Sequence, residues 1–571
     1  MACESINERM DDKDSTSCKV ELELAVEDDG IIINDGKLLY GVDETPTWPT
    51  LIILIVQNFL MMVSGIIGIP LLLAGLVCMR SDIEAYAHLI SSTFFIQGVV
   101  TFTQSTIGIR LPVIQGASFS FIPAVSSLAV AAGACPAGND TISDMSEVWG
   151  PRLAEVNGGL LLASVFQVIL GLTGLSGWIL RFVGPLSIAP CIGLLGLALI
   201  DATWPSCSVH WGISLVTIFF VVLFSQYLKN INVCAFRYNI KSAPRASGQI
   251  FQLFPVIFAG VIGWIFAFIL TVSGVLPDDP ANPSYYARTD IGSDFIAKAR
   301  WFQLPSPVTR QWPVITFAAF FGMFAGILAS IVESLGDYSA CAKLSEVPPP
   351  PRHAVNRGIF VEGVGCVLSG LWGTGSGTGT YSGNIVAIGM TRVASRKVTQ
   401  GTAILVIIVG LFGKVTAFLA SIPDPVIGGI LASIIGILLS VSVTILQKSD
   451  MTSPRNLFIF GISMFSGLAL PDFLEKYPDA IKTGSDQIDQ ILIILLRTGM
   501  FVGGVVGFFL DNTIPGTEQE RGISLRELGE RSSSTEQSSV YDIPFITKRI
   551  RQRPWTRFIP VCPTFGSSTQ N

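Results

Sequence analysis

The sequence predicts an all-α polytopic membrane protein. Of its 571 residues, 50% are hydrophobic and only 14% are charged, and the mean hydropathy is +0.58. Soluble domains carry about 25% charged residues, so this composition excludes a soluble fold. The apolar residues also form long runs, each close to the roughly 20 residues that cross a hydrocarbon layer of about 30 Å. Composition and run length therefore agree on a chain that spans the membrane many times.

The apolar runs number about fourteen and form two sets of about seven, separated by a polar loop. The expected spans cover 50–78, 87–107, 111–131, 158–175, 178–200, 211–228 and 251–276, and then 313–332, 359–372, 373–390, 402–422, 426–446, 457–470 and 491–510. The chain accordingly divides into an acidic N-terminal tail (1–48), a first seven-span repeat (49–276), an extracellular loop (277–312), a second seven-span repeat (313–510) and a C-terminal tail (511–571).

The loop charges predict that both termini are cytoplasmic. Lys and Arg concentrate after the sixth, eighth and tenth spans, and basic loops stay on the cytoplasmic side of a membrane. The one Asn-x-Ser/Thr acceptor, Asn139, follows the third span and must be lumenal to be glycosylated. The first 48 residues lack the order of a signal peptide. The Ser-rich and basic C-terminal tail is expected to be solvated, with contact to anionic lipid as the alternative.

The cysteines and histidines give no sign of a metal site or an enzyme. Ten cysteines and three histidines show no ligand spacing, and no nucleophile–base constellation is apparent. Most cysteines, Cys78 among them, are expected to be small packing residues. Cys135 and Cys207 are expected in exoplasmic loops, where a disulfide between them is one hypothesis, although no spacing rule requires it. Basic residues are too scattered for a nucleic-acid surface.

Two of the spans cannot be ordinary helices. The third, RLPVIQGASFSFIPAV (110–125), sets Gln115 and Ser118 among apolar residues, and the tenth, GTGSGTGTYSGNIVAIGMT (373–391), is a run of Gly, Thr and Ser. Such runs do not form stable lipid-facing helices, so both are expected to be short extended pieces that lead into half-helices. Interrupted segments at matching positions in two halves indicate a transporter binding site; a glycine-rich packing face is the alternative.

Two acids strengthen this hypothesis. Glu333 and Asp337 are four residues apart in the eighth span, so they share a helix face, and ionisable residues within a membrane usually mark a solute or ion path. A carboxylate near unwound carbonyls is also a suitable ligand for a hard cation such as sodium. The alternative is that Asp337 lies at the membrane interface. Gln57 and Asn58 add amides to the first span, where helix packing is the competing interpretation.

These motifs resemble the nucleobase–ascorbate transporter family, solute carrier family 23. The resemblance covers about residues 40–525 and is strongest in VESLGDYSACAKLSEVPPPPRHAVNRGIFVEGVGCVLSGLWGTGSGTG (332–379), SRKVTQ (395–400) and FVGGVVGFFLDNTIPGTEQERG (501–522). It is closest to the animal sodium-dependent vitamin C transporters. It implies a seven-plus-seven inverted repeat with a core (spans 1–4 and 8–11) and a gate (spans 5–7 and 12–14), and a homodimer formed through the gates.

The resemblance also implies the site residues. The family's substrate acid falls on Glu333, and Asp337 stands where proton-coupled bacterial members have histidine. The span-ten signature, (Gln/Glu/Pro)-Asn-x-Gly-x4-Thr-(Arg/Lys), reads Gly383-Asn384 here, with valine at 386 in place of glycine, and the Gln-His pair of span one is Gln57-Asn58. The implied substrate contacts are Gln57, Asn58, Gln115, Ser118, Phe119, Glu333, Gly383 and Asn384, with Asp337 and Ser118 coupling to sodium.

The expected function is sodium-coupled uptake of ascorbate, or a related small polar solute, by alternating access across the plasma membrane. Gly383 offers neither an acceptor for a ring N–H nor a charge that would repel an anion, which favours ascorbate. The alternatives are a nucleobase transporter of the xanthine or uracil type and a transport-inactive sensor or scaffold. No cofactor is expected beyond the coupling sodium ion, and the expected partners are the solute, the lipid bilayer and a second copy of the chain.

Overall fold

The computed structural model describes residues 38–571 apart from 81, 134, 136–144, 176–181, 183, 230, 232–250, 252–253, 280–281, 308–311, 448, 478–479, 518–519, 522–539, 544–546, 548–555, 557–558 and 563–571. Asn139 and most of the basic loop after the sixth span lie outside the described residues.

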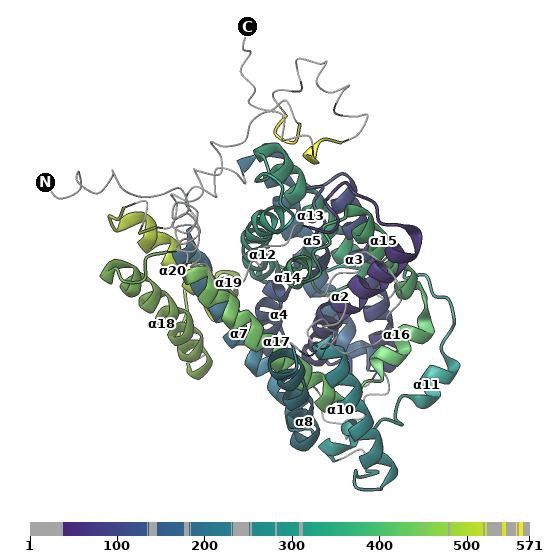
Figure 1. Ribbon diagram of the computed structural model, residues 1–571. Helices are drawn as coiled ribbons and strands as arrows, with labels where there is room; N and C mark the ends of the chain where they lie inside the picture. The colour runs from purple at the N-terminus through teal and green to yellow at the C-terminus, as the bar shows by residue number, and fades with distance from the viewer. Residues whose placement is uncertain are drawn as a thin grey trace, which may run out of the picture. The chain divides into compact units, whose positions relative to one another are not determined.

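The first half contains seven apolar segments in chain order (Figure 1). They are α2 (Trp48–Leu76), α3 (Ile83–Thr106), β1 (Gln115–Ala117) with η2 (Phe119–Phe121) and α4 (Ile122–Ala131), α5 (Ser146–Thr173), α7 (Pro185–Ser208), α8 (Trp211–Val222) with the π-turn η3 (Leu223–Tyr227), and α10 (Pro255–Val272). The loop that follows carries η5 (Pro283–Ala287) and α11 (Ser293–Lys298).

The second half repeats the pattern. Its elements are α12 (Phe317–Leu344), α13 (Arg352–Trp372), β2 (Thr378–Thr380) with α14 (Ser382–Thr391), α15 (Arg396–Leu411) with α16 (Gly413–Ala420), α17 (Asp424–Leu446), α18 (Pro454–Lys476), and α19 (Asp486–Arg497) with α20 (Gly499–Thr513). Helices α2, α4, α7, α10, α17 and α18 each have proline in their first two positions, where its missing N–H costs nothing.

Helix length supports nine or ten of the expected spans. Nine helices of the described residues are long and apolar enough to cross a membrane, and α19 with α20, bent by 79°, would make a tenth. The other expected spans are shorter or interrupted: the third and tenth are broken, the sixth ends in a π-turn, and the eleventh is split at Phe412. The prediction of an all-α polytopic fold is confirmed.

The helix contacts show an inverted repeat. Helix α5 packs against α13, and their equivalents in the opposite halves, α15 and α3, pack against each other. Three further contacts correspond in the same way between the halves. The α5–α12 contact corresponds to α15–α2, the α8–α17 contact to α18–α7, and the α8–α10 contact to α18–α20. An internal two-fold relation between the halves produces this matched pairing. The expected seven-plus-seven repeat is therefore present in the contacts themselves.

The same contacts separate two bundles (Figure 1). The first bundle holds α2–α5 and α12–α16, and the second holds α7, α8, α10 and α17–α20. They meet mainly through α2, α4 and α12 on one side and α7, α17 and α19 on the other. Each bundle combines helices from both halves, as expected for a core and a gate.

The two broken segments are joined by a short antiparallel sheet. The register pairs Gln115 with Thr380, Gly116 with Gly379, and Ala117 with Thr378. All six residues are buried, so the pairing satisfies backbone groups that could not face lipid. The prediction of extended pieces that lead into the short helices α4 and α14 is confirmed.

Close packing also explains some of the glycines in the tenth span. A Cβ on Gly377 would lie 2.5 Å from Cζ of Phe121 and 2.9 Å from Sγ of Cys366. Such distances leave no room for a side chain. The packing alternative therefore holds for Gly377 alongside the broken-segment interpretation.

The disulfide hypothesis is wrong in its pairing. Cys135 bonds to Cys78, while Cys207 is a buried free thiol. Cys78 directly follows α2 and Cys135 follows α4, two helices that contact each other. Cys207 lies instead against α17, 2.8 Å from the position of a Cβ on Gly428. The interpretation of Cys78 as a packing residue is corrected as well.

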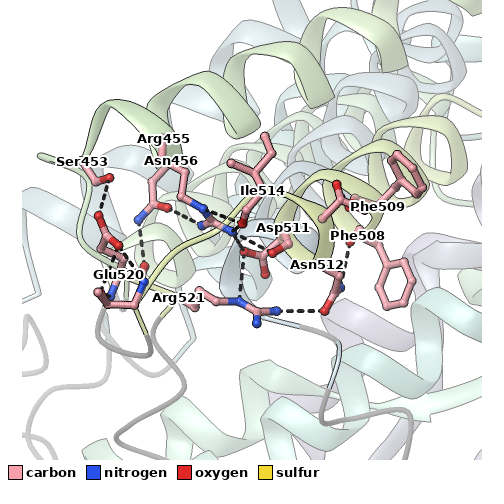
Figure 2. Close-up of polar contacts among 12 residues, drawn as sticks. Ser453, Arg455, Asn456, Phe508, Phe509, Asp511, Asn512, Ile514, Glu520 and Arg521 are labelled. Carbon is pink, nitrogen blue, oxygen red and sulfur yellow. Dashed lines mark hydrogen bonds and ion pairs between the residues drawn. The ribbon is translucent and has the colours of Figure 1, made fainter.

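A polar cluster closes one end of the second bundle (Figure 2). The buried Asp511 carboxylate accepts a hydrogen bond from Nη2 of Arg455 at 3.0 Å and lies 3.5 Å from Nε of Arg521. Arg455 also donates to the carbonyls of Asp511 and Ile514. The cluster ties the end of α20 to the start of α18.

Parts of the C-terminal tail pack against the first bundle, so the expectation of a solvated tail is wrong for these residues. Tyr541 is buried, and Nη2 of Arg357 donates to its carbonyl at 2.7 Å. The carbonyl of Val540 accepts from Arg396 at 3.1 Å and from Arg110 at 3.4 Å. The three arginines are themselves buried, so charge-assisted hydrogen bonds to the backbone hold the tail in place.

We expect Arg357→Ala to destabilise the protein by about 1–3 kcal/mol, because the buried carbonyls that it serves would lose their donor. Arg357 also donates to the Gly108 carbonyl at 2.6 Å. The measurement is the apparent melting temperature in detergent. Lys343→Ala, which removes an exposed basic residue from the last turn of α12, is the control and should have little effect. An equal loss in both variants would contradict the account.

Candidate functional site

The candidate site lies where α12 meets both broken segments. Helix α12 contacts η2 and α4 of the first broken segment and β2 and α14 of the second. It also contacts α7, α19 and α20 of the second bundle. The face of α12 that carries the two acids is therefore close to both interruptions and to the boundary between the bundles.

Glu333 is linked to the first broken segment. Glu333 is half-buried, and its carboxylate accepts a hydrogen bond from Oγ of Ser120 at 3.4 Å. The backbone N–H of Ser120 donates to Oγ of Ser118 at 3.3 Å. These contacts link Glu333 to Ser118 through Ser120, and they leave the carboxylate with further acceptor positions.

Asp337 is linked to the second broken segment. Its Oδ2 accepts a hydrogen bond from Oγ of Ser382 at 2.8 Å, and Ser382 is the first residue of α14. One turn of α12 thus joins one acid to each interruption. Asp337 is half-buried, and this contact ties it to the second broken segment.

Gln115 serves the sheet. Its side chain is buried and its Nε2 donates to Oγ1 of Thr380 at 3.0 Å, while its backbone N–H donates to Oγ1 of Thr101 at 2.9 Å. Phe119 lies at the boundary between the bundles. Its Cζ is 3.6 Å from the position of a Cβ on Gly68 of α2, a position that is also 3.0 Å from Leu431 of α17.

Three other expected residues line a separate cavity. Gln57 and Asn58 of α2 and Asn384 of α14 border an empty volume of about 360 Å³, which does not include Glu333. Nδ2 of Asn58 donates to Oγ1 of Thr402 at 3.4 Å, and Nδ2 of Asn384 donates to the Pro112 carbonyl at 2.8 Å. The structure therefore divides the expected site residues into two groups, one beside Glu333 and one beside this cavity.

Gly383 is covered by Tyr381, a residue that the sequence reasoning missed. A Cβ on Gly383 would lie 2.6–2.7 Å from Cζ, Cε1 and the hydroxyl oxygen of Tyr381. The aromatic ring therefore occupies the space that a larger residue at 383 would need. The available signal was one large side chain in a run of Gly, Ser and Thr. The side chain at 386 lies outside the described residues.

A second missed residue is the buried acid Glu362 of α13. It is 0% exposed, and its carboxylate accepts hydrogen bonds from Oγ of Ser334 at 2.9 Å, Tyr338 OH at 3.1 Å and Nε2 of Gln167 at 3.2 Å. Oγ of Ser334 in turn accepts from the backbone N–H of Thr380 at 3.2 Å. A buried carboxylate requires such donors, and this set connects β2 to α5, α12 and α13. The signal was an acid within the expected span 359–372.

Known proteins share much of this sequence. Residues 49–476 match the model of a family described as the permease family. Solute carrier family 23 member 1 of Mus musculus is 41% identical over 94% of this chain and 90% of that protein. Solute carrier family 23 member 2 of Homo sapiens is 40% identical over 93% of this chain and 83% of its own length. Nucleobase-ascorbate transporter 1 of Arabidopsis thaliana is 32% identical over 85% of this chain and 91% of its length.

We expect the effect of Gly383→Ala on stability to depend on the residue at position 381. In the presence of Tyr381 the added methyl group collides with the ring and should lower the apparent melting temperature. In the Tyr381→Ala background the collision is gone, and the substitution should be neutral or stabilising, since alanine is favoured over glycine in helices by about 1 kcal/mol. Gly389→Ala on the same helix, whose Cβ would meet only ordinary contacts, is the control.

Additive effects of the two substitutions would contradict the steric coupling. Residues in contact typically show interaction energies of about 0.5–3 kcal/mol in such cycles, so the coupling is large enough to measure.

Proposed function

Because the chain belongs to the nucleobase–ascorbate transporter family, we propose that it is a secondary active transporter that takes up ascorbate, or a related small polar solute, together with sodium by alternating access. The observation that supports this most is the antiparallel pairing of the two broken segments against the acids of α12, next to the boundary between the bundles. Unwound backbone at this place offers polar groups to a solute.

The start of α14 suits an anionic solute. Helix α14 begins at Ser382, and no side chain caps its first turn; the N–H groups at a helix start have no partner within the helix. Such groups, together with the helix dipole, attract negative charge. Ascorbate is a monoanion at neutral pH and carries several hydroxyl groups, which Glu333 can accept from. The two ends of the solute would thus meet opposite kinds of partner.

The Tyr381 ring affects which substrate the site suits. From sequence, Gly383 was expected to offer neither an acceptor for a ring N–H nor a charge that repels an anion, and in the structure Tyr381 covers this position. A phenol there provides one neutral donor and acceptor and a flat apolar face. It adds no negative charge near α14, which favours an anion. A flat face also suits a planar nucleobase, so xanthine and uracil are the alternative substrates to compare.

Sodium is proposed to bind beside Asp337. The Asp337 carboxylate, the Ser382 hydroxyl that contacts it at 2.8 Å and nearby carbonyls of the broken segments are hard oxygen ligands of the kind that alkali and alkaline-earth cations take. Ser118 remains a further candidate ligand. Because Asp337 is joined to α14, occupation of this place by a cation would stabilise the helix end that faces the solute.

The proposed orientation has both termini in the cytoplasm. The Cys78–Cys135 bond forms in an oxidising compartment, so the end of the first bundle that carries it is assigned to the exoplasmic side. The opposite end holds Arg110, Arg357 and Arg396, which agrees with the cytoplasmic preference of basic residues. We further propose a plasma-membrane homodimer through the second bundle, whose α10 and α18 expose many apolar side chains.

The first test is uptake of radiolabelled ascorbate, xanthine and uracil by cells that express the protein, in sodium or choline medium. We expect sodium-dependent uptake of ascorbate. Sodium-independent uptake of a nucleobase instead would replace the proposed substrate and coupling, and no uptake of any solute by protein present at the surface would favour a sensor or scaffold.

Substitutions of the two acids should have different effects in the same uptake assay. Asp337→Asn should lower the affinity for sodium, whereas the affinity for ascorbate at saturating sodium should change little. Glu333→Gln should raise the KM for ascorbate at every sodium concentration, by roughly 10- to 100-fold, the equivalent of one hydrogen bond to a charged group. An unchanged sodium dependence in Asp337→Asn protein that reaches the surface would remove Asp337 from the sodium site.

A further inference from the structure

An ion pair connects the two bundles at the end that carries the disulfide. Nη1 of Arg80 lies 2.7 Å from Oδ2 of Asp424, and its Nη2 donates to Oγ of Ser206 at 2.7 Å. Arg80 follows α2 in the first bundle, whereas Asp424 begins α17 and Ser206 lies near the end of α7 in the second. One guanidinium group therefore holds both central helices of the second bundle.

The ion pair is partly buried between the two bundles. The side chains of Arg80 and Asp424 are only 24% and 16% exposed, so water screens their attraction less than on an open surface. The planar guanidinium uses two separate nitrogens for two partners, a geometry that lysine cannot reproduce. Asp424 is also placed in the first turn of α17, where the helix dipole favours a negative charge.

The segment that presents Arg80 is fixed to the first bundle. Cys78, two residues earlier, is bonded to Cys135. Nη1 of Arg152 contacts Sγ of Cys78 at 3.2 Å, and its Nη2 donates to the Ala132 carbonyl at 3.2 Å. The backbone near Arg80 thus follows the first bundle, while the charged end of its side chain is bound to the second. Relative motion of the bundles at this end must break the contact.

A cavity borders the first half of α2, away from Arg80. The cavity of about 360 Å³ is lined by Gln57 and Asn58 in the first half of α2 and by Asn384, Thr391 and Val398 of the second broken segment and its flank. Arg80, by contrast, follows the last turn of α2. This cavity lies between α2, α14 and α15 and so within the first bundle, whereas the Arg80 ion pair joins the two bundles to each other.

We propose that Arg80, with Asp424 and Ser206, is a latch that keeps the exoplasmic side closed and that must open each time the site faces outward. Arg80 is a positioning residue: it acts on the relative placement of the bundles and does not contact the solute. This inference rests on the alternating access and the orientation proposed above. It identifies the conformation described here as the one closed to the outside.

The test is the accessibility of the bundle boundary from outside the cell. Cysteine is introduced as Ile434→Cys on α17, whose native side chain faces Gly68 and lies near Phe119. Labelling by a membrane-impermeant maleimide is followed on intact cells, against the same protein without Ile434→Cys. Surface amounts are measured by biotinylation. Arg80→Gln and Asp424→Asn should each raise the labelling rate, by roughly two- to tenfold, as expected for loss of one partly buried pair.

A charge exchange provides the rescue. Arg80→Asp combined with Asp424→Arg should bring labelling back toward the original rate, which a merely structural role of either residue would not do. The matched control is Arg288→Gln. Arg288 pairs with Asp290 at 2.6 Å and with Asp278 inside the loop 277–312, on the same proposed side but within one loop, so labelling should stay unchanged.

Unchanged labelling in both single variants at normal surface levels would overturn the latch, and so would labelling that requires permeabilised cells in every variant. The readout does not depend on the solute. If labelling responds as expected but no ascorbate uptake is found, the latch holds and the proposed substrate fails.

Discussion

Backbone groups inside a membrane must be hydrogen-bonded within the protein, and the β1–β2 pairing is how this chain meets that requirement at its two interruptions. Each broken segment supplies the partners that the other lacks. Neighbouring helices supply further acceptors. Oγ1 of Thr101 accepts a hydrogen bond from the backbone N–H of Gln115, and Oγ of Ser334 accepts one from the backbone N–H of Thr380. Without this pairing, neither interruption could persist in the bundle, and there would be no unwound backbone to bind a solute.

The buried acids follow from the same constraint. Glu362 accepts hydrogen bonds from three side-chain donors of two helices, and one of these donors, Ser334, also contacts the backbone of β2. Glu333 and Asp337 are each in contact with a hydroxyl of one broken segment. Helix α12 thus connects both interruptions through a single helix face.

The sequence predicted those features that depend on composition. Runs of Gly, Thr and Ser cannot form a lipid-facing helix, so the interruptions were evident, and acids four residues apart must share a helix face. Features that depend on which distant parts of the chain come into contact could not be predicted from the sequence. The pairing of Cys78 with Cys135 requires knowing that α2 and α4 end side by side. The cover of Gly383 by Tyr381 depends on a rotamer, and the docking of Tyr541 depends on three arginines from distant parts of the chain.

The central claim is that the paired interruptions and α12 together form the solute site. It is tested most directly by an experimental structure of the protein determined with sodium and ascorbate. We expect ascorbate between Glu333 and the first turn of α14, with Tyr381 against it and β1 still paired with β2. Ascorbate bound away from both interruptions, for example in the cavity bordered by Trp149 and Trp372, would contradict the account.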